Sequence, residues 1–379
     1  MPDVSQDGID RGFMSRALRL ARRGLMTTAP NPRVGCVLVK QGAIVGEGWH
    51  RVAGGDHAEV IALQRAGSDA AGATAYVTLE PCSHTGRTPP CVKSLIAAGV
   101  GRVVVAMEDP NPLVQGRGIA ALRGAGIDVS LGLLAAEARA LNRGFCARMQ
   151  RGMPFVFAKL ASSIDGRTAM ANGESKWITS PAARQQVQRM RAASCAIITG
   201  VDTVLQDDPA LTVREDLLGA PYPEATLRQP LRVIVDSRLR THSWSRILKE
   251  PGDAVIATLV EDRKRIRRYE ALGCQVVTLP SAGERVSMTA LLHWLAEQRA
   301  CNEVMVESGA RLAGSLLSDG LLDEIHLFMA PTLLGSNARP LVELPLVHMG
   351  EQVRLDLQEL RAVGDDWWLR LVPSRRRRT

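Results

Sequence analysis

The stretch TLEPCSHTGRTPPC, residues 78–91, contains two cysteines separated by eight residues, and the tripeptide HAE lies upstream of it at 57–59. One imidazole and two thiolates, from His57, Cys82 and Cys91, make three protein ligands for a metal ion. A catalytic zinc ion is held by three such ligands and keeps its fourth position open for water, whose pKa it lowers towards neutrality. We therefore predict one catalytic zinc site per chain at this stretch.

Glu59 lies two residues after the predicted ligand His57. On a regular helix such residues point in nearly opposite directions, so both can serve one site only in a loosely constrained first turn. The turn residues GGD at 54–56 place them there. H-x-E followed by P-C and a second cysteine is typical of zinc-dependent base deaminases, in which the glutamate moves protons and is not a ligand. We predict Glu59 as this catalytic residue.

Strands and helices alternate around these motifs. The predicted helices lie at 9–23, 57–66, 91–99, 117–125 and 134–149, and the predicted strands at 34–39, 43–49, 73–80, 102–107 and 127–132. This alternation is typical of a layered α/β domain. The Gly152-Met153-Pro154 stop signal ends the last helix, so we place a domain boundary at about residue 150.

The second half of the chain alternates in the same way. Its predicted strands lie at 155–160, 195–200, 231–237, 254–259, 274–279, 303–308 and 323–330, and its predicted helices begin after Ser180-Pro181 and near 288 and 311. No G-x-G-x-x-G follows its first strand, so the Rossmann dinucleotide fingerprint is absent. The turn ESGA at 307–310 feeds a helix start that could cradle phosphate. From the residues alone, ordinary turn chemistry is the favoured explanation for this turn, for SIDGR at 163–167 and for the loop at 199–214, and ligand binding is the alternative.

Composition narrows the class of protein. The chain has 379 residues and a net charge of +8, with Arg375 to Arg378 together in a tail that we expect to be solvated and disordered. The remaining excess suits anionic small substrates at least as well as nucleic acid. Seven cysteines without an export signal do not suggest disulfides, and Cys36, Cys195 and Cys274 are predicted core residues. No apolar run approaches a membrane span and the N-terminus lacks a secretory pattern, so we expect no membrane partner and a cytoplasmic location.

Longer motifs carry a family resemblance. The first half contains NPRVG (31–35), the HAE and TLEPCSHTGRTPPC motifs and EDPNPLVQGRGI (108–119); the second contains KLASSIDGRTAM (159–170), GESKWITS (173–180), DTVLQDDPALTVR (202–214), VIVDS (233–237) and a VESG turn. In these motifs the chain resembles the bifunctional deaminase–reductase (RibD) family of riboflavin biosynthesis. The eight-residue spacing of the two cysteines departs from the usual C-x-x-C of base deaminases and narrows the resemblance to this family.

The resemblance implies a fold and two activities. It implies a cytidine-deaminase-like three-layer α/β/α domain at 1–150, a dihydrofolate-reductase-like α/β domain at 151–373 and a basic tail at 374–379. The first domain would use zinc to deaminate 2,5-diamino-6-hydroxy-4-(5-phosphoribosylamino)pyrimidine to 5-amino-6-(5-phosphoribosylamino)uracil. The second would use NADPH to reduce the ribosyl group to a ribityl chain. The implied partner is thus a phosphorylated pyrimidine.

Site residues follow from the same motifs, position by position. The resemblance implies NADPH contacts at Ala161, Trp177, Thr203, Asp207, Ser237, Gly309, Ala310, Arg311, Leu312, Ala313, Gly314 and Ser315. It implies reductase substrate contacts at Ser175, Arg191, Leu211, Arg214 and Glu307. Candidates for ring and ribose-phosphate contacts in the deaminase pocket are Asn31, His50, His84, Arg87 and Thr88. The arginines suit phosphate because a guanidinium donates two parallel hydrogen bonds.

Two other classes of function remain as alternatives. A nucleic-acid (tRNA) base deaminase with an accessory domain would share H-x-E and zinc, but it predicts a basic strip with stacking aromatic residues. Aromatic residues make up only 4% of the chain, so we expect no nucleic-acid partner. A binding module with structural zinc would not need an acid such as Glu59 beside the metal. We expect a homo-oligomer, because symmetric homo-oligomers are common.

Overall fold

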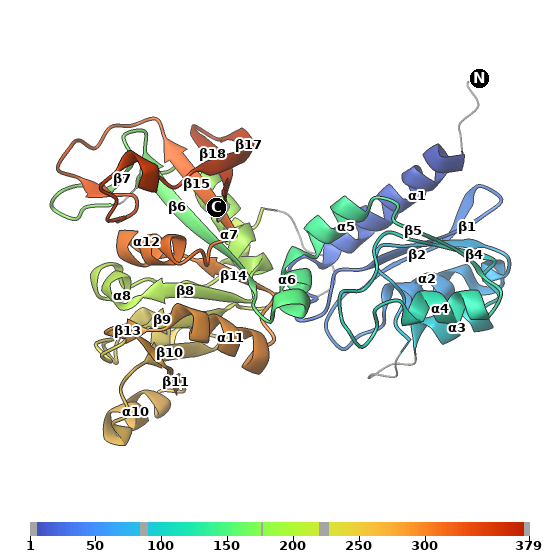
Figure 1. Ribbon diagram of the computed structural model, residues 1–379, viewed down its shortest axis with the longest axis horizontal. Coiled ribbons are helices and arrows are strands. Elements are labelled where there is room, and N and C mark those ends of the chain that lie inside the picture. Colours follow the sequence, from blue (N-terminus) through green and yellow to red (C-terminus); the bar gives the residue numbers. More distant parts are fainter. Residues whose placement is uncertain (1–5, 84–89, 176, 220–226, 375–379) are drawn as a thin grey trace. The chain divides into compact units, whose positions relative to one another are not determined.

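The computed structural model describes residues 6–83, 90–175, 177–219 and 227–374. It divides into two compact units that meet in the sequence between Gly152 and Met153 (Figure 1). Within the described part of the chain, no helix is both long and apolar enough to cross a membrane.

The first unit is built on a five-stranded sheet with the strand order β2-β1-β3-β4-β5. β1 (Gly35–Lys40) and β2 (Ala43–Trp49) form the predicted hairpin, and β1 also pairs antiparallel with β3 (Thr74–Val77). β4 (Arg102–Val105) and β5 (Asp128–Leu131) continue the sheet in parallel from β3. The loop that carries the TLEPCSHTGRTPPC motif follows β3, and the loop that carries the EDPNPLVQGRGI motif follows β4.

Helices cover both faces of the first sheet. One apolar core joins the strands to α2 (Ala58–Ala66), α3 (Cys91–Ala97) and α4 (Arg117–Gly124). A second core joins the other face to α1 (Gln6–Ala21), α5 (Ala135–Leu141) and α6 (Arg143–Arg151). The short turns η1 (Arg22–Gly24) and η2 (Gly67–Ala70) follow α1 and α2. The predicted three-layer α/β/α arrangement is therefore confirmed.

Glycines on β2 let α2 lie unusually close to the sheet. A β-carbon at Gly46 would come within 2.3 Å of the Ala62 carbonyl oxygen, and one at Gly48 within 2.2 Å of the Ala58 carbonyl oxygen. Only residues without a side chain permit this approach. The start of α2, which carries the HAE motif, is thereby held tightly against the sheet.

The single helix predicted at 134–149 is wrong in one respect, because the structure has two helices, α5 and α6, that meet at Asn142. The Asn142 side chain accepts a hydrogen bond from the Arg33 backbone N–H at 2.8 Å and donates one to the Arg33 carbonyl oxygen at 2.9 Å. Its backbone has left the helical region, with φ −110°. The break is thus set by a long-range contact that helical periodicity does not contain.

The second unit has a nine-stranded sheet with the order β11-β10-β9-β8-β14-β6-β15-β18-β17. The strands are β6 (Phe155–Ser163), β8 (Ala196–Gly200), β9 (Leu231–Val235), β10 (Ala254–Thr258), β11 (Gln275–Thr278), β14 (Glu303–Val306), β15 (Glu324–Ala330), β17 (Leu355–Val363) and β18 (Asp366–Pro373). Neighbours from β11 to β15 run parallel, while β18 pairs antiparallel with β15 and β17. This is the predicted α/β class, with an added C-terminal hairpin.

Helices and short elements complete the second unit. The helices are α7 (Pro181–Ala193), α8 (Val201–Asp207), α9 (Arg246–Lys249), α10 (Arg263–Glu270), α11 (Met288–Gln298) and α12 (Ala310–Ser318); the short elements are β7 (Arg167–Ala169), β12 (Ser281–Ala282), β13 (Arg285–Val286), β16 (Arg339–Pro340), η3 (Glu215–Leu217) and η4 (Met349–Glu351). Ser180 caps α7 as predicted, because its hydroxyl accepts a hydrogen bond from the Ala183 N–H at 3.3 Å. The loop predicted at 199–214 is partly wrong: its first half forms α8, where Val201 and Val204 are buried.

The seven cysteines are all free. Cys36, Cys195 and Cys274 are buried, which confirms the prediction that they are core residues. Cys146 and Cys301 are buried as well.

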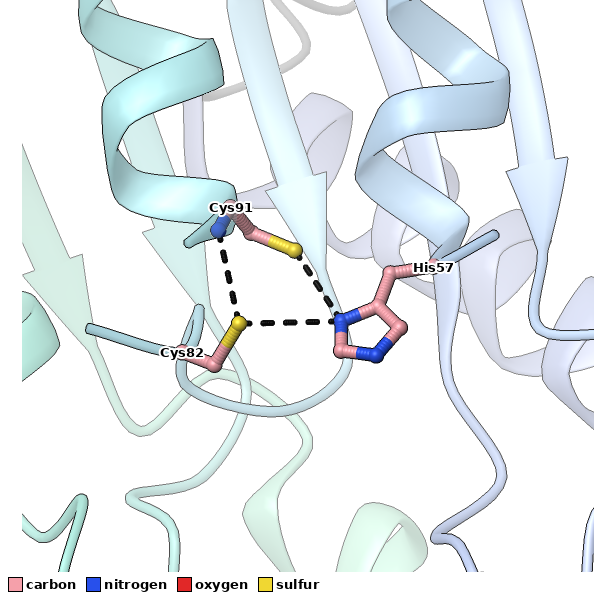
Figure 2. A group of neighbouring side chains, drawn as sticks. All are labelled: His57, Cys82 and Cys91. Carbon is pink, nitrogen blue, oxygen red and sulfur yellow. Dashed lines mark hydrogen bonds between the residues drawn. The ribbon is translucent and has the colours of Figure 1, made fainter. Parts of the chain in front are cut away.

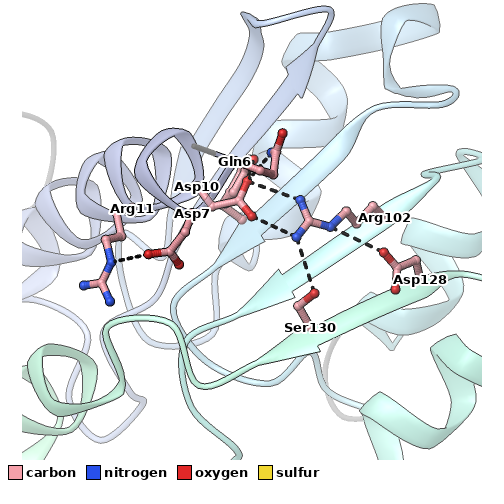
Figure 3. A network of polar contacts seen from close by, with 8 residues as sticks. Gln6, Asp7, Asp10, Arg11, Arg102, Asp128 and Ser130 are labelled. Carbon is pink, nitrogen blue, oxygen red and sulfur yellow. Dashed lines mark hydrogen bonds and ion pairs between the residues drawn. The ribbon is translucent and has the colours of Figure 1, made fainter. Parts of the chain in front are cut away.

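A buried carboxylate joins α1 to the first sheet. Asp10 accepts hydrogen bonds from both terminal nitrogens of Arg102, at 3.2 and 2.8 Å, from the Tyr76 hydroxyl at 2.7 Å and from the Gln6 amide at 2.8 Å (Figure 3). Burial raises the pKa of Asp10, but the hydrogen bonds from Arg102, Tyr76 and Gln6 outweigh it and hold the pKa below its ordinary value. Asp10 therefore stabilises the fold as a carboxylate.

Replacing Asp10 with asparagine is expected to destabilise the first unit by about 2 kcal/mol, because Arg102 and Tyr76 lose a buried acceptor. A carboxyl whose pKa is lowered on folding stabilises the fold above its unfolded-state pKa, and this contribution disappears as the pH falls through the folded-state pKa. The difference in the free energy of unfolding between wild type and variant should thus be largest near neutrality. It should shrink below pH 3.8, which is the ordinary pKa of an aspartate. This difference is measured by urea unfolding in which the hydrogen exchange of amides in β3 and β4 is followed.

Asp7→Asn is the matched control, because Asp7 pairs with Arg11 on the exposed side of the same helix (Figure 3). Exposed pairs contribute less than about 1 kcal/mol. An Asp7 variant as unstable as the Asp10 variant would contradict the role of the buried network.

Candidate functional site

The predicted metal ligands meet in the first unit. His57 Nδ1 lies 3.1 Å from Cys91 Sγ and 3.6 Å from Cys82 Sγ, and all three ligand atoms lie within 4.8 Å of one another (Figure 2). Cys82 Sγ also accepts a hydrogen bond from the Cys91 backbone N–H at 3.3 Å. Within the described residues this is the only such cluster of three or more potential ligands.

Two helix starts place these ligands. His57 is the N-cap of α2, and Cys91 is the first residue of α3, as predicted. The hydrogen bond that the Cys91 thiol donates is the first cause that lowers the pKa of Cys82, to about 4, and the same bond raises the pKa of Cys91. The two sulfur atoms thus share one proton opposite an imidazole nitrogen. A thiophilic divalent cation fits there, since it would replace that proton and gain two thiolates and one imidazole.

Glu59 lies in the first turn of α2, beside the ligand cluster, and is only 3% exposed. Burial, and next the negative charge of Cys82, raise the pKa of Glu59 to about 7. A carboxyl group poised near neutrality can both accept and release a proton, which is what general acid–base chemistry requires.

Two of the predicted pocket residues form a chain of hydrogen bonds next to the cluster. His50 is buried, its Nδ1 lies 3.0 Å from the Asp56 carbonyl oxygen, and its Nε2 lies 3.0 Å from the Asn31 amide nitrogen. These partners require a neutral ring with the proton on Nδ1. Burial lowers the pKa of His50, in agreement with the neutral form. The His50 ring meets the His57 ring edge-on, with centroids 5.5 Å apart. His84, Arg87 and Thr88 lie outside the described residues.

In the second unit, the predicted cofactor residues gather along the carboxyl edge of the parallel strands. Thr203 lies in α8, directly after β8, Ser237 follows β9, and Gly309 follows β14 and is the N-cap of α12. Thr203 Oγ1 accepts a hydrogen bond from the Gly309 N–H at 3.1 Å, which joins two of these loops. This edge is where open α/β sheets bind their ligands.

The other predicted cofactor residues vary in their surroundings. Ala161 lies in β6 and Asp207 ends α8, whereas the Trp177 ring is 70% exposed, with the Arg184 guanidinium 4.4 Å from its centroid. The rest lie in the first turns of α12: Ala310, Arg311, Leu312, Ala313, Gly314 and Ser315. Gly314 serves packing, because a β-carbon there would come within 2.0 Å of the Glu343 carbonyl oxygen.

Arg191 and Glu307 form a nearly buried ion pair. Arg191 Nε donates to Glu307 Oε1 at 2.6 Å, and Nη2 donates to Oε2 at 2.8 Å. Arg191 Nη1 also donates to the Thr212 carbonyl oxygen at 3.0 Å. Arg191 was predicted as a phosphate ligand, but here its fork binds a carboxylate. The pair joins α7 to the end of β14.

Lys159 is a functional candidate that the sequence reasoning missed. It lies in β6, next to β14, and burial lowers its pKa while Glu307 raises it and Arg191 lowers it. Lys159 and Arg191 thus both interact electrostatically with Glu307. The signal in the sequence was a single lysine in the otherwise apolar strand FVFAKL at 155–160.

Of the remaining predicted substrate residues, Leu211 and Arg214 flank Thr212, whose carbonyl oxygen accepts from Arg191. Leu211 is buried and has φ +52°, a backbone conformation that is strained for a branched residue. Such strain is common at ligand-binding sites. Arg214 is exposed, and its backbone N–H donates a hydrogen bond to the Gln188 side-chain oxygen at 3.0 Å. Ser175 is half-buried.

Comparisons with known proteins agree with both halves. Residues 8–107 match the cytidine and deoxycytidylate deaminase zinc-binding region, and residues 154–369 match the RibD C-terminal domain. The riboflavin biosynthesis protein RibD of Escherichia coli is 51% identical over 96% of this chain and 99% of its own, and that of Haemophilus influenzae is 48% identical over 98% of each. Acinetobacter baumannii RibD (form 2) superposes with a TM-score of 0.89 at 44% identity, covering 98% of this chain and 100% of its own.

A Thermotoga maritima structure is also similar, with a TM-score of 0.85 at 31% identity over 98% of this chain and 100% of its own. It is named as a diaminohydroxyphosphoribosylaminopyrimidine deaminase and 5-amino-6-(5-phosphoribosylamino)uracil reductase. The fold and the matches define a bifunctional enzyme with a deaminase domain and a reductase domain. The chain belongs to the RibD family of riboflavin biosynthesis proteins.

Proposed function

We propose that this chain catalyses two successive steps of riboflavin biosynthesis on one pyrimidine. The first is the hydrolytic deamination of 2,5-diamino-6-hydroxy-4-(5-phosphoribosylamino)pyrimidine, in which water supplies oxygen and ammonia leaves. The second is reduction of the ribosyl group of the resulting uracil to a ribityl chain. The order follows from chemistry, since the reductase substrate named for the Thermotoga relative is already a uracil. The observation that carries the proposal is the His57, Cys82 and Cys91 cluster beside buried Glu59.

We assign deamination to residues 1–150 and reduction to 151–373. His57, Cys82 and Cys91 would hold one zinc ion, and zinc, when bound, supplies a Lewis acid that acidifies a water ligand. Glu59 would accept a proton at its carboxylate and pass it to the ring nitrogen and the departing amine. Asn31 and His50 would orient the ring, since their amide and imidazole already lie in one hydrogen-bonded chain. His84, Arg87 and Thr88 stay candidates for the ribose-phosphate contacts.

In the second unit, the loops after β8, β9 and β14 would bind NADPH, the hydride donor. Gly309 has no side-chain cap, so the first N–H groups of α12 are placed to meet a phosphate group. We assign Ser175, Leu211, Arg214 and the Arg191–Glu307 pair to the substrate. Lys159 is placed beside that pair to hold or deliver a proton, since its pKa is lowered by burial.

Removal of zinc should separate the two activities. Treating the full chain with a strong zinc chelator is expected to abolish ammonia release from the diamino substrate, because the proposed nucleophile is a water molecule that zinc acidifies. Oxidation of NADPH with the deaminated substrate should continue, since its residues lie in the other unit. Metal analysis should find one zinc per chain before treatment and none after it. Full deamination by the metal-free protein would contradict the zinc assignment.

The tRNA-deaminase alternative finds no support in the comparisons, which match the reductase half as well as the deaminase half. The cytoplasmic location and the homo-oligomer stay predictions.

A further inference from the structure

Glu80 is a buried carboxylate that takes no part in the chemistry described above. It lies just after β3 and is 3% exposed. Its Oε2 accepts hydrogen bonds from the backbone N–H groups of Asp109 at 3.1 Å and Gly116 at 3.0 Å. Its Oε1 accepts from those of Gly118 at 2.9 Å and Ile119 at 3.1 Å. Four neutral amides thus surround one negative charge.

All four donors belong to one segment, residues 109–119, which enters α4. The N-cap of α4, Gly116, has φ +74° and offers no side-chain cap, so Glu80 provides the acceptor that the first turn lacks. The segment also lies against the next residue of the loop, because a β-carbon at Gly118 would come within 2.1 Å of the Pro81 carbonyl oxygen. Glu80 and Pro81 therefore fix this segment to the loop after β3.

The same loop carries a metal ligand two residues later. Cys82 accepts a hydrogen bond from the Cys91 N–H at its sulfur, at 3.3 Å, and one from the Val92 N–H at its carbonyl oxygen, also at 3.3 Å. A continuous set of contacts thus runs from residues 109–119 through Glu80 to both cysteine ligands. Metal affinity depends on ligands being held within a few tenths of an ångström, and residues that orient ligands affect it strongly.

We propose that Glu80 is a positioning residue for the metal centre: it holds Cys82 in place by clamping residues 109–119 against the Cys82 loop. The proposal rests on the proposed zinc site. It concerns the position of Cys82 rather than the negative charge of Glu80. Glutamine keeps the shape of the side chain but turns an NH2 group towards two N–H donors, so it breaks two of the four hydrogen bonds. Aspartate keeps the charge but is too short to reach all four donors.

The test uses the full chain with Glu80→Gln and Glu80→Asp. Zinc affinity is measured by competition with a chromophoric chelator, and hydrogen exchange by mass spectrometry of peptides covering 109–119. We expect zinc to bind about 10- to 100-fold more weakly in Glu80→Gln. Amides in 109–119 should exchange faster, and Glu80→Asp should be impaired in both measurements. Glu47→Gln is the control, because Glu47 binds Arg16 and contacts neither the segment nor the ligands.

Unchanged zinc affinity in Glu80→Gln, or full recovery in Glu80→Asp, would overturn the proposal. The second result would show that only the negative charge matters. Both readouts are independent of substrate, so they remain decisive even if the wild-type protein proved unable to deaminate the proposed pyrimidine. Oxidation of NADPH with the deaminated substrate, expected to be unchanged, reports whether the second unit is intact in each variant.

Discussion

Replacing Glu59 with glutamine is expected to lower the deamination rate by about a thousandfold or more while zinc stays bound. Glutamine matches the size of the buried side chain but can neither accept nor release a proton at neutral pH. His57, Cys82 and Cys91 are untouched, so the metal content should remain one zinc per chain. The measurement is ammonia release from the diamino substrate, with metal analysis of the same sample.

The control for Glu59→Gln lies in the same chain. Reduction of the deaminated substrate by NADPH should proceed at the wild-type rate, since its residues belong to the second unit. Substantial deamination by a zinc-loaded Glu59→Gln protein would remove Glu59 from the proton-transfer role. Loss of zinc would instead show that Glu59 is needed to hold the metal.

Replacing Glu307 with glutamine is expected to have the largest effect on the reductase. The change leaves Arg191 and Lys159 as two cations without their shared carboxylate, whose two oxygens now accept from Arg191 at 2.6 and 2.8 Å. Removing one partner of a buried ion pair destabilises the fold by about 3 kcal/mol or more. We expect the disruption to reach the substrate that this pair is proposed to bind, where a loss of about 3 kcal/mol corresponds to about a hundredfold in rate. NADPH oxidation with the deaminated substrate should fall by that factor.

Asp253→Asn is the matched control for Glu307→Gln. Asp253 precedes β10 and pairs with Arg299 at 3.4 Å, and its side chain is 75% exposed. Exposed pairs contribute little, so reduction should stay within about twofold of wild type. Deamination should be unaffected in both variants. Equal losses of reduction in the two variants would contradict a specific role for Glu307.

Much of the deaminase site could be predicted because its chemistry is local in the sequence. The predicted ligand His57 and the predicted proton carrier Glu59 lie at one helix start, and Cys91 begins a helix that follows two prolines in the sequence. The spacing of the two cysteines, taken together with the NPRVG, HAE and EDPNPLVQGRGI motifs, indicated the family.

The contacts that could not be predicted join residues far apart in the chain. Asn142 interrupts a helical pattern because it binds the backbone of Arg33, 109 residues away. Nothing in the sequence distinguishes Glu80 from any other glutamate in a motif. Only the fold shows that the backbone N–H groups of residues 109–119 bind its carboxylate. Lys159 and Glu307 interact electrostatically because β6 and β14 are neighbours, which the order of residues does not reveal.

The C-terminal hairpin escaped prediction for a different reason. The apolar residues Leu355, Leu357 and Leu360 of β17 are exposed, and the register with β18 shifts between Leu357 and Glu359, so β17 does not show the regular pattern of a half-buried strand. Its pairing with β18 therefore depends on backbone hydrogen bonds and on the buried Trp368, rather than on the alternation that identifies a half-buried strand.

The central claim is that one chain carries both steps, and one measurement tests it most directly. The purified full-length protein is incubated with the diamino substrate, with and without NADPH, and the products are followed by mass spectrometry. Without NADPH, the product should show only the exchange of an amine for oxygen; with NADPH, it should also gain two hydrogens. An unchanged substrate under both conditions, or a gain of hydrogens without loss of the amine, would contradict the account.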